Sequence, residues 1–158
     1  MKWLMVCLGN ICRSPLAEGI LQTLAKKNTL NWEVDSAGTA DYHIGEPPHR
    51  LSQKVAQLNG IDISKQRCKQ FSVADFEKFD RILVMDQQNL ADVLSLAPNQ
   101  KAASKVSLLL DALYPGEGRE VPDPWYGKEE GYHEVFALIR KACEALIKSQ
   151  KSGSRNQQ

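Results

Sequence analysis

The chain has 158 residues, 42% of them apolar and 25% charged, which is enough for one compact domain with a hydrophobic core. The 20 basic and 19 acidic residues leave a formal net charge of +1, which argues against nucleic acid or another polyanion as a partner. The apolar stretch after Lys2 is too short for a signal peptide, and no run reaches membrane-spanning length. We therefore expect a cytoplasmic protein with no membrane segment.

The first predicted element is a buried strand at residues 3–6, which leads almost directly into a helix. Bulky apolar residues fill the strand, and apolar residues then recur at helical spacing at Leu16, Ile20, Leu21 and Leu24. The intervening residues 7–15, CLGNICRSP, are thus predicted to form a strand-to-helix loop.

This loop has the features of an oxyanion site. Five residues separate Cys7 from Arg13, enough for backbone N–H groups to surround one tetrahedral anion. Gly9 permits a backbone conformation that most side chains oppose, and Arg13 can grip two phosphate oxygens. Ser14 suits an N-cap and Pro15 the first helical turn, so the positive helix end would face the anion.

The cysteine at the start of the loop suggests catalysis. A field that attracts phosphate also favours the thiolate over the thiol, and a thiolate below a phosphorus atom is a positioned nucleophile. A lone cysteine is more often a small buried apolar residue. The neighbouring Gly9, Arg13 and Ser14 favour the catalytic interpretation of Cys7.

Residues 6–15, VCLGNICRSP, resemble the signature loop of the low-molecular-weight protein tyrosine phosphatases. The resemblance implies hydrolysis of phosphotyrosine and small aryl phosphates through a phosphocysteine intermediate, with no cofactor or metal. It implies that Asn10 braces the loop and that Ser14 donates to the Cys7 sulfur. The phosphate or another oxyanion would be held by Leu8, Gly9, Asn10, Ile11, Cys12, Arg13 and Ser14.

A second short strand is predicted at 32–35, followed by a turn at 36–39. The resemblance implies that Ser36 hydrogen-bonds the phosphate loop from behind, whereas the residues alone fit an ordinary turn serine equally well. A loop at 42–48 precedes a helix that contains Leu51, Val55 and Leu58 and stops at Asn59-Gly60. Near the start of this helix the segment 49–51, His-Arg-Leu, departs from the family's usual sequence, a change that bears on the local loop contacts and not on the chemistry.

The remaining elements continue the alternation of strands and helices. We expect a short helix within 71–79 capped by Ser72, a strand at 80–85, a helix at 89–96 and an apolar run at 106–110. A long final helix contains eight apolar residues at helical spacing: Val135, Phe136, Leu138, Ile139, Ala142, Cys143, Leu146 and Ile147. The polar segment 149–158 is predicted to be a disordered tail that follows a domain at 1–148.

Connections of this length favour parallel pairing with right-handed crossovers. The fold class is therefore α/β: a single three-layer domain with a four-stranded, parallel, twisted sheet and helices on both faces. The resemblance makes this fold flavodoxin-like, of the phosphotyrosine phosphatase I type. Ligands of such sheets bind beyond the carboxyl ends of the strands, where Cys7 falls.

Asp123 is the candidate general acid. It is bracketed by Pro122 and Pro124, which stiffen the segment, although an isolated Asp-Pro is usually an ordinary surface turn. The segment resembles the family's general-acid loop, with Trp125 in place of a tyrosine. Asp123 would protonate the leaving oxygen and then activate the hydrolytic water.

The resemblance also implies a deep slot for an aryl ring, with walls from Leu8, Tyr42, Trp125 and Tyr126. Asp86, directly after the third strand, would support the site from behind. The related protein-arginine phosphatases carry Thr at the position of Ile11, so Ile11 favours phosphotyrosine.

The four cysteines, at 7, 12, 68 and 143, are expected to be mostly reduced, and the three histidines form no recognisable metal-ligand pattern. Cys12 either packs beneath the loop or forms a reversible disulfide with Cys7, as the family is reported to do.

Two rival functions remain. An arsenate reductase on the same fold would need two further cysteines close together, and only Cys68 lies mid-chain. A non-catalytic phosphoprotein-binding module would not need Cys7, Arg13 and Asp123 together. We expect phosphotyrosine proteins as partners, and a monomer or weak dimer.

Overall fold

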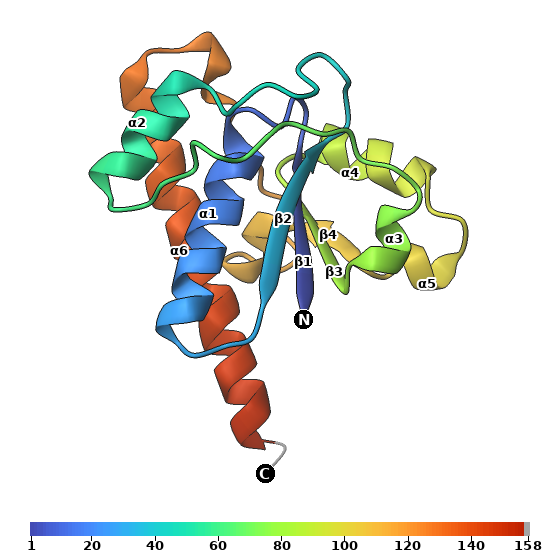
Figure 1. Ribbon diagram of the computed structural model, residues 1–158. Helices are drawn as coiled ribbons and strands as arrows, with labels where there is room; N and C mark the ends of the chain where they lie inside the picture. Colours follow the sequence, from blue (N-terminus) through green and yellow to red (C-terminus); the bar gives the residue numbers. More distant parts are fainter. Residues whose placement is uncertain (157–158) are drawn as a thin grey trace.

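Four parallel strands form the centre of the fold (Figure 1). The computed structural model describes residues 1–156. The strands are β1 (Lys2–Cys7), β2 (Glu33–Gly38), β3 (Arg81–Val84) and β4 (Val106–Leu108). Their order in the sheet is β2-β1-β3-β4, so the chain begins on a central strand and crosses over to reach each neighbour. The predicted α/β fold class is confirmed.

Helices cover both faces of the sheet and complete three layers. In Figure 1, α1 and α6 lie together on one face with α2 beside them, and α3, α4 and α5 lie on the other. The helices are α1 (Arg13–Lys27), α2 (Arg50–Leu58), α3 (Asp75–Lys78), α4 (Gln87–Ser95), α5 (Gln100–Ala103) and α6 (Glu129–Asn156), with short 3-10 helices at Leu109–Ala112 and Pro124–Tyr126.

The sequence of β1 explains why it is central. Trp3 and Met5 pack into the core beneath α1 and α6, while Leu4 and Val6 pack into the core beneath α3 and α4. Successive strand residues point to opposite faces, so a strand buried on both faces needs an uninterrupted apolar run. Residues 3–6 supply that run and deliver Cys7 to the carboxyl edge of the sheet.

One predicted boundary and one predicted helix cap were wrong. Ser36 lies within β2 rather than in a turn, because pairing with β1 continues through Met5↔Ser36 to Cys7↔Gly38. The short helix predicted within 71–79 is confirmed as α3, but its N-cap position is Ala74 and not Ser72. Instead, the Ser72 backbone N–H donates to the Asp75 carboxylate at 2.9 Å.

The helix α6 continues through Asn156 and so includes residues 149–156 of the predicted tail. Once a buried apolar stripe has formed the helix, each added residue such as Lys or Gln costs little, so a polar sequence extends it. The Lys151 ammonium contacts the Asn28 side chain at the end of α1. Residues 157 and 158 of the predicted tail lie outside the described residues.

Candidate active site

The Cys7 sulfur lies where β1 ends, and α1 begins only six residues later at Arg13. This start is earlier than predicted, and Ser14 is not the N-cap. The cap position is Cys12, which makes no side-chain capping bond. The Ser14 hydroxyl is instead directed at the nucleophile candidate, with its Oγ 3.0 Å from Cys7 Sγ.

Asn10 gives the loop its tight curvature. Its φ of 57° lies in the left-handed region, which asparagine tolerates better than most residues, and its backbone N–H donates to Cys7 Sγ at 3.3 Å. The conformation expected of Gly9 is thus adopted by Asn10. Gly9 instead allows a close approach, since a Cβ there would lie 3.3 Å from the His43 ring and would push that ring back by a few tenths of an ångström.

The Asn10 side chain braces the loop against neighbouring elements. Its Nδ2 donates to Ser14 Oγ at 2.8 Å and to Ser36 Oγ at 3.0 Å, and its Oδ1 accepts from the Lys69 backbone N–H at 3.0 Å. All of these contacts lie behind the loop. Ser36 therefore lies where the resemblance expected it, although it comes from a strand.

The Arg13 side chain is only 3% exposed, and two groups hold it in place. Its Nη1 pairs with Asp86 Oδ2 at 2.7 Å and donates to the Val121 carbonyl at 3.1 Å. Burial alone would lower the pKa of Arg13, but Cys7, Asp86 and Asp123 together raise it above its ordinary value. The guanidinium is thus a fixed positive charge at the bottom of the site.

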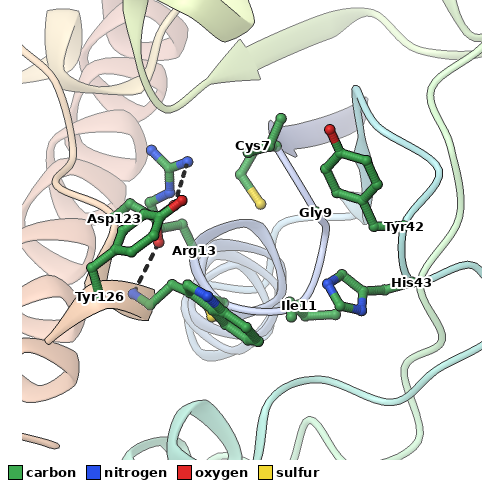
Figure 2. Close-up of a pocket in the computed structure, with 11 residues that line it drawn as sticks. Cys7, Gly9, Ile11, Arg13, Tyr42, His43, Asp123 and Tyr126 are labelled. Carbon is green, nitrogen blue, oxygen red and sulfur yellow. Dashed lines mark hydrogen bonds and ion pairs between the residues drawn. The ribbon is translucent and has the colours of Figure 1, made fainter. Parts of the chain in front are cut away.

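Asp123 lies beside Arg13 although the two residues are far apart in the sequence. It precedes the 3-10 helix Pro124–Tyr126, and its Oδ1 accepts from the Trp125 backbone N–H at 3.0 Å. Its Oδ2 lies 3.7 Å from Arg13 Nη2. Figure 2 shows the carboxylate beside the Arg13 guanidinium, with the Cys7 sulfur directed into the space next to them.

These groups share one pocket of about 270 Å³. Its lining comprises Cys7, Leu8, Gly9, Ile11, Cys12, Arg13, Tyr42, His43, Asp123, Trp125 and Tyr126. All four residues predicted for the aryl slot belong to this lining, and Tyr42 and Tyr126 form an open rim, 71% and 85% exposed. Asn10 and Ser14, by contrast, are buried behind the wall.

His43 was missed by the sequence analysis. Its ring lies next to Gly9 at the edge of the pocket (Figure 2). The ring is 5.9 Å from the Trp125 ring, and its Nδ1 is 2.5 Å from Glu46 Oε2. A single histidine in a loop rich in glycine and proline carries no spacing pattern that would reveal such a position.

The other thiols are buried and, like Cys7, free. Burial raises the pKa of Cys12 to about 12 and that of Cys68 to about 11. Cys12 Sγ lies 3.7 Å from the Tyr132 hydroxyl, and Cys68 Sγ donates to the Asn10 carbonyl at 2.8 Å. Cys143 belongs to α6 and is buried in the core.

Residues 1–156 contain no group of three or more His, Cys, Asp or Glu side chains arranged to hold a metal ion. Nor does any helix in that part of the chain combine the length and the apolar character needed to cross a membrane.

A cysteine and an arginine in one strand-to-helix loop, faced by a carboxylate at the carboxyl edge of a parallel sheet, are typical of cysteine-dependent phosphatases. The comparisons with known proteins specify the class. The model of the family described as low molecular weight phosphotyrosine protein phosphatase matches residues 2–156, and the chain belongs to this family.

Individual relatives span almost the whole chain. A low molecular weight protein-tyrosine-phosphatase of Bacillus subtilis is 40% identical over 148 residues, 92% of this chain and 93% of its own length. The crystal structure of a protein tyrosine phosphatase from Entamoeba histolytica superposes with a TM-score of 0.90 at 36% identity, covering 98% and 99% of the two chains. A Drosophila arginine phosphatase superposes with a TM-score of 0.89 at 32% identity, covering 96% and 98%.

Proposed function

We propose that this protein tyrosine phosphatase hydrolyses phosphotyrosine and small aryl phosphates in two steps through a phosphocysteine intermediate. The observation that carries the proposal is the shared pocket: the Cys7 sulfur, the buried Arg13 guanidinium and the Asp123 carboxylate all line it. Asp123 Oδ2 is 3.7 Å from Arg13 Nη2, so an acid and an anion holder are adjacent in the structure.

In the first step the Cys7 thiolate attacks phosphorus and forms an S–P bond while the bond from phosphorus to the aryl oxygen breaks. Asp123 gives its proton to that oxygen, so the phenol leaves neutral. In the second step Asp123 takes a proton from water, the resulting hydroxide attacks phosphorus, and the S–P bond breaks to release phosphate and the thiolate.

Arg13 and the backbone N–H groups of residues 8–13 stabilise the phosphoryl oxygens in both transition states. Asp86 and the Val121 carbonyl hold the guanidinium, so it is oriented before substrate arrives. Ser14 Oγ lies 3.0 Å from Cys7 Sγ, so its hydroxyl would donate to the thiolate and stabilise it when the S–P bond breaks. The same loop would bind inorganic phosphate as product and competitive inhibitor.

The exposed aromatic rings of Tyr42, Trp125 and Tyr126 support a substrate with an aryl leaving group, because ring faces and edges pack against one another. Ile11 supports the choice of phosphotyrosine over phosphoarginine, since an apolar side chain offers no hydrogen-bond partner to a leaving guanidine. Comparing kcat/KM for phosphotyrosine and phosphoarginine peptides tests this directly. A preference for phosphoarginine would reassign the substrate.

The proposal is tested with p-nitrophenyl phosphate in the presence of EDTA. We expect turnover, a burst of one nitrophenolate per enzyme when hydrolysis of the intermediate is slow, and no turnover in Cys7→Ser. Cys143→Ala is the matched control, because it removes a core thiol far from the pocket and should retain activity. Activity in the Cys7→Ser variant would refute the mechanism.

Neither rival function has the same support. An arsenate reductase would need two further cysteines close together, whereas here Cys68 is buried and donates to the Asn10 carbonyl, and Cys143 is buried in the core as part of α6. Thioredoxin-coupled reduction of arsenate would revive that rival. A cytoplasmic location, metal-independent turnover and a monomeric or weakly dimeric state remain predictions.

A further inference from the structure

A continuous chain of hydrogen bonds links the Cys7 sulfur to a carboxylate that the proposed reaction does not use. Cys7 Sγ is 3.0 Å from Ser14 Oγ, which accepts from Asn10 Nδ2 at 2.8 Å. The same Nδ2 donates to Ser36 Oγ at 3.0 Å, and Ser36 Oγ donates to Glu18 Oε1 at 2.7 Å. This series of hydrogen bonds therefore ends at the Glu18 carboxylate.

The available donors and acceptors determine which atom donates in each of these hydrogen bonds. Asn10 Nδ2 has two hydrogens and uses one for each serine, while Asn10 Oδ1 is occupied by the Lys69 N–H at 3.0 Å. Each serine must then donate its own hydrogen elsewhere. Ser36 donates to Glu18, and Ser14 has the Cys7 sulfur at 3.0 Å, closer than the Ala37 carbonyl at 3.5 Å.

Glu18 is well placed to accept the Ser36 hydrogen. It follows Ser14 by four residues on α1, so both side chains lie on the helix face next to β2, which carries Ser36. The charged groups that act on its carboxyl are Asp35 of β2 and Lys69, which contact each other. Burial raises the pKa of Glu18 to about 7. A carboxyl group retains an acceptor oxygen in either protonation state, so the link to Ser36 does not require the charge.

We propose that Glu18 is a positioning residue for the nucleophile: it accepts the Ser36 hydrogen and so keeps the Asn10 amide oriented with the Ser14 hydroxyl free to donate to the Cys7 sulfur. The inference rests on the proposed function and deepens it. Without this acceptor the Ser36 hydrogen would turn toward Asn10, which can accept it only by reversing its amide. A reversed amide would also draw the Ser14 hydrogen away from the sulfur and leave the Lys69 N–H unpaired.

The test compares Glu18→Ala, which removes the acceptor, with Glu18→Gln, which keeps an acceptor oxygen and removes the charge. We expect Glu18→Ala to lower kcat for p-nitrophenyl phosphate by about tenfold, the equivalent of one lost hydrogen bond, with KM little changed. Alkylation of Cys7 by iodoacetate at neutral pH should slow by the same factor. Glu18→Gln should restore both quantities to within about twofold of the unmodified protein.

Asp35→Asn is the matched control, because it removes a neighbouring negative charge, keeps an oxygen that can accept from the Ser36 backbone N–H, and changes none of the side chains from Cys7 to Glu18 that form the series. It should leave kcat and alkylation unchanged. Ser36→Ala should reproduce the Glu18→Ala loss, and the double variant should be no worse than either single one, since both remove the same link. Thermal melting verifies that each variant is folded, and Ser36→Ala provides the test if Glu18→Ala is not.

Three results would overturn the inference: normal kcat and alkylation in Glu18→Ala, an equal loss in Glu18→Gln, or losses that add in the double variant. An equal loss in Glu18→Gln would identify charge as the cause. If the unmodified protein failed to hydrolyse the substrate, the proposed function would fail instead, while the alkylation rates would still test the positioning of Cys7.

Discussion

Asp86 serves two partners with its two carboxylate oxygens, which makes its replacement informative. Oδ2 pairs with the buried Arg13 guanidinium at 2.7 Å, and Oδ1 accepts from the Asn89 N–H at 2.8 Å as the N-cap of α4. Asp86→Ser keeps a capping oxygen but cannot reach Arg13, so it isolates the ion pair. The Asp86 side chain is 20% exposed and that of Arg13 3%, so solvent screens this pair little.

Hydrogen bonds to charged groups contribute about 1.5–3 kcal/mol, and an unpaired buried charge costs more, so we expect Asp86→Ser to lose about 2–3 kcal/mol of unfolding free energy. In a domain of this size that corresponds to a melting temperature about 4–12 °C lower. A loosened Arg13 should also lower kcat by about 10–100-fold.

The measurements are urea unfolding and steady-state turnover of p-nitrophenyl phosphate. Asn99→Ala is the control, because it removes the cap of α5, where Asn99 Oδ1 accepts from the Ala102 N–H, and touches no part of the pocket. It should cost about 1 kcal/mol and leave kcat unchanged. If Asp86→Ser remained within about 0.5 kcal/mol of the unmodified protein with full kcat, the reasoning about Arg13 would be wrong.

Four further predictions follow from the geometry. Asp123→Asn should lower kcat for aryl phosphates by about 10²–10⁴ with the melting temperature nearly unchanged, and a smaller loss would count against Asp123 as the acid. Gly38→Ala should abolish turnover while circular dichroism stays native-like. The new Cβ would lie 2.8 Å from the Leu8 carbonyl oxygen and 3.1 Å from the Asn10 backbone nitrogen, so the phosphate loop would have to move. Full activity would show that the loop can shift at no cost. The pKa of Glu18 is raised to about 7 in the folded protein, so Glu18 binds its proton more tightly there than in the unfolded chain. The free energy of unfolding, measured with urea relative to Glu18→Gln, should therefore fall by at most about 3 kcal/mol as pH rises from 4.5 to about 7 and then stay level. A constant difference across this pH range would contradict the raised pKa. After treatment with peroxide, mass spectrometry should detect a peptide that joins Cys7 to Cys12, and its absence from inactivated protein would exclude the disulfide.

The fold and the phosphate loop were largely predictable, because their signals are local in sequence. An uninterrupted apolar run identifies β1 as buried on both faces, and helical spacing resumes within nine residues of Cys7. The alternation of strands and helices then restricts the sheet to parallel pairing, and the carboxyl edge becomes the expected site. These inferences need no knowledge of distant contacts.

What failed depends on side-chain and backbone contacts that exist only once the chain has folded. Ser36 looks like a turn residue until β1 provides its backbone partners, and Ser14 looks like an N-cap until Cys7 and Asn10 engage its hydroxyl. Glu18 resembles any glutamate on a helix surface, since its partner Ser36 is 18 residues away. His43 carries no pattern at all.

The pocket joins opposite ends of the chain, since the loop that holds Cys7 follows the first strand and Asp123 immediately precedes the last helix. No N-terminal fragment that stops short of residue 123 can therefore contain both groups. During synthesis on the ribosome, the sulfur and its anion cradle emerge first, and more than a hundred further residues are added before the carboxylate can join them. A nascent chain that stops before Asp123 could hold an oxyanion but would have no acid beside it.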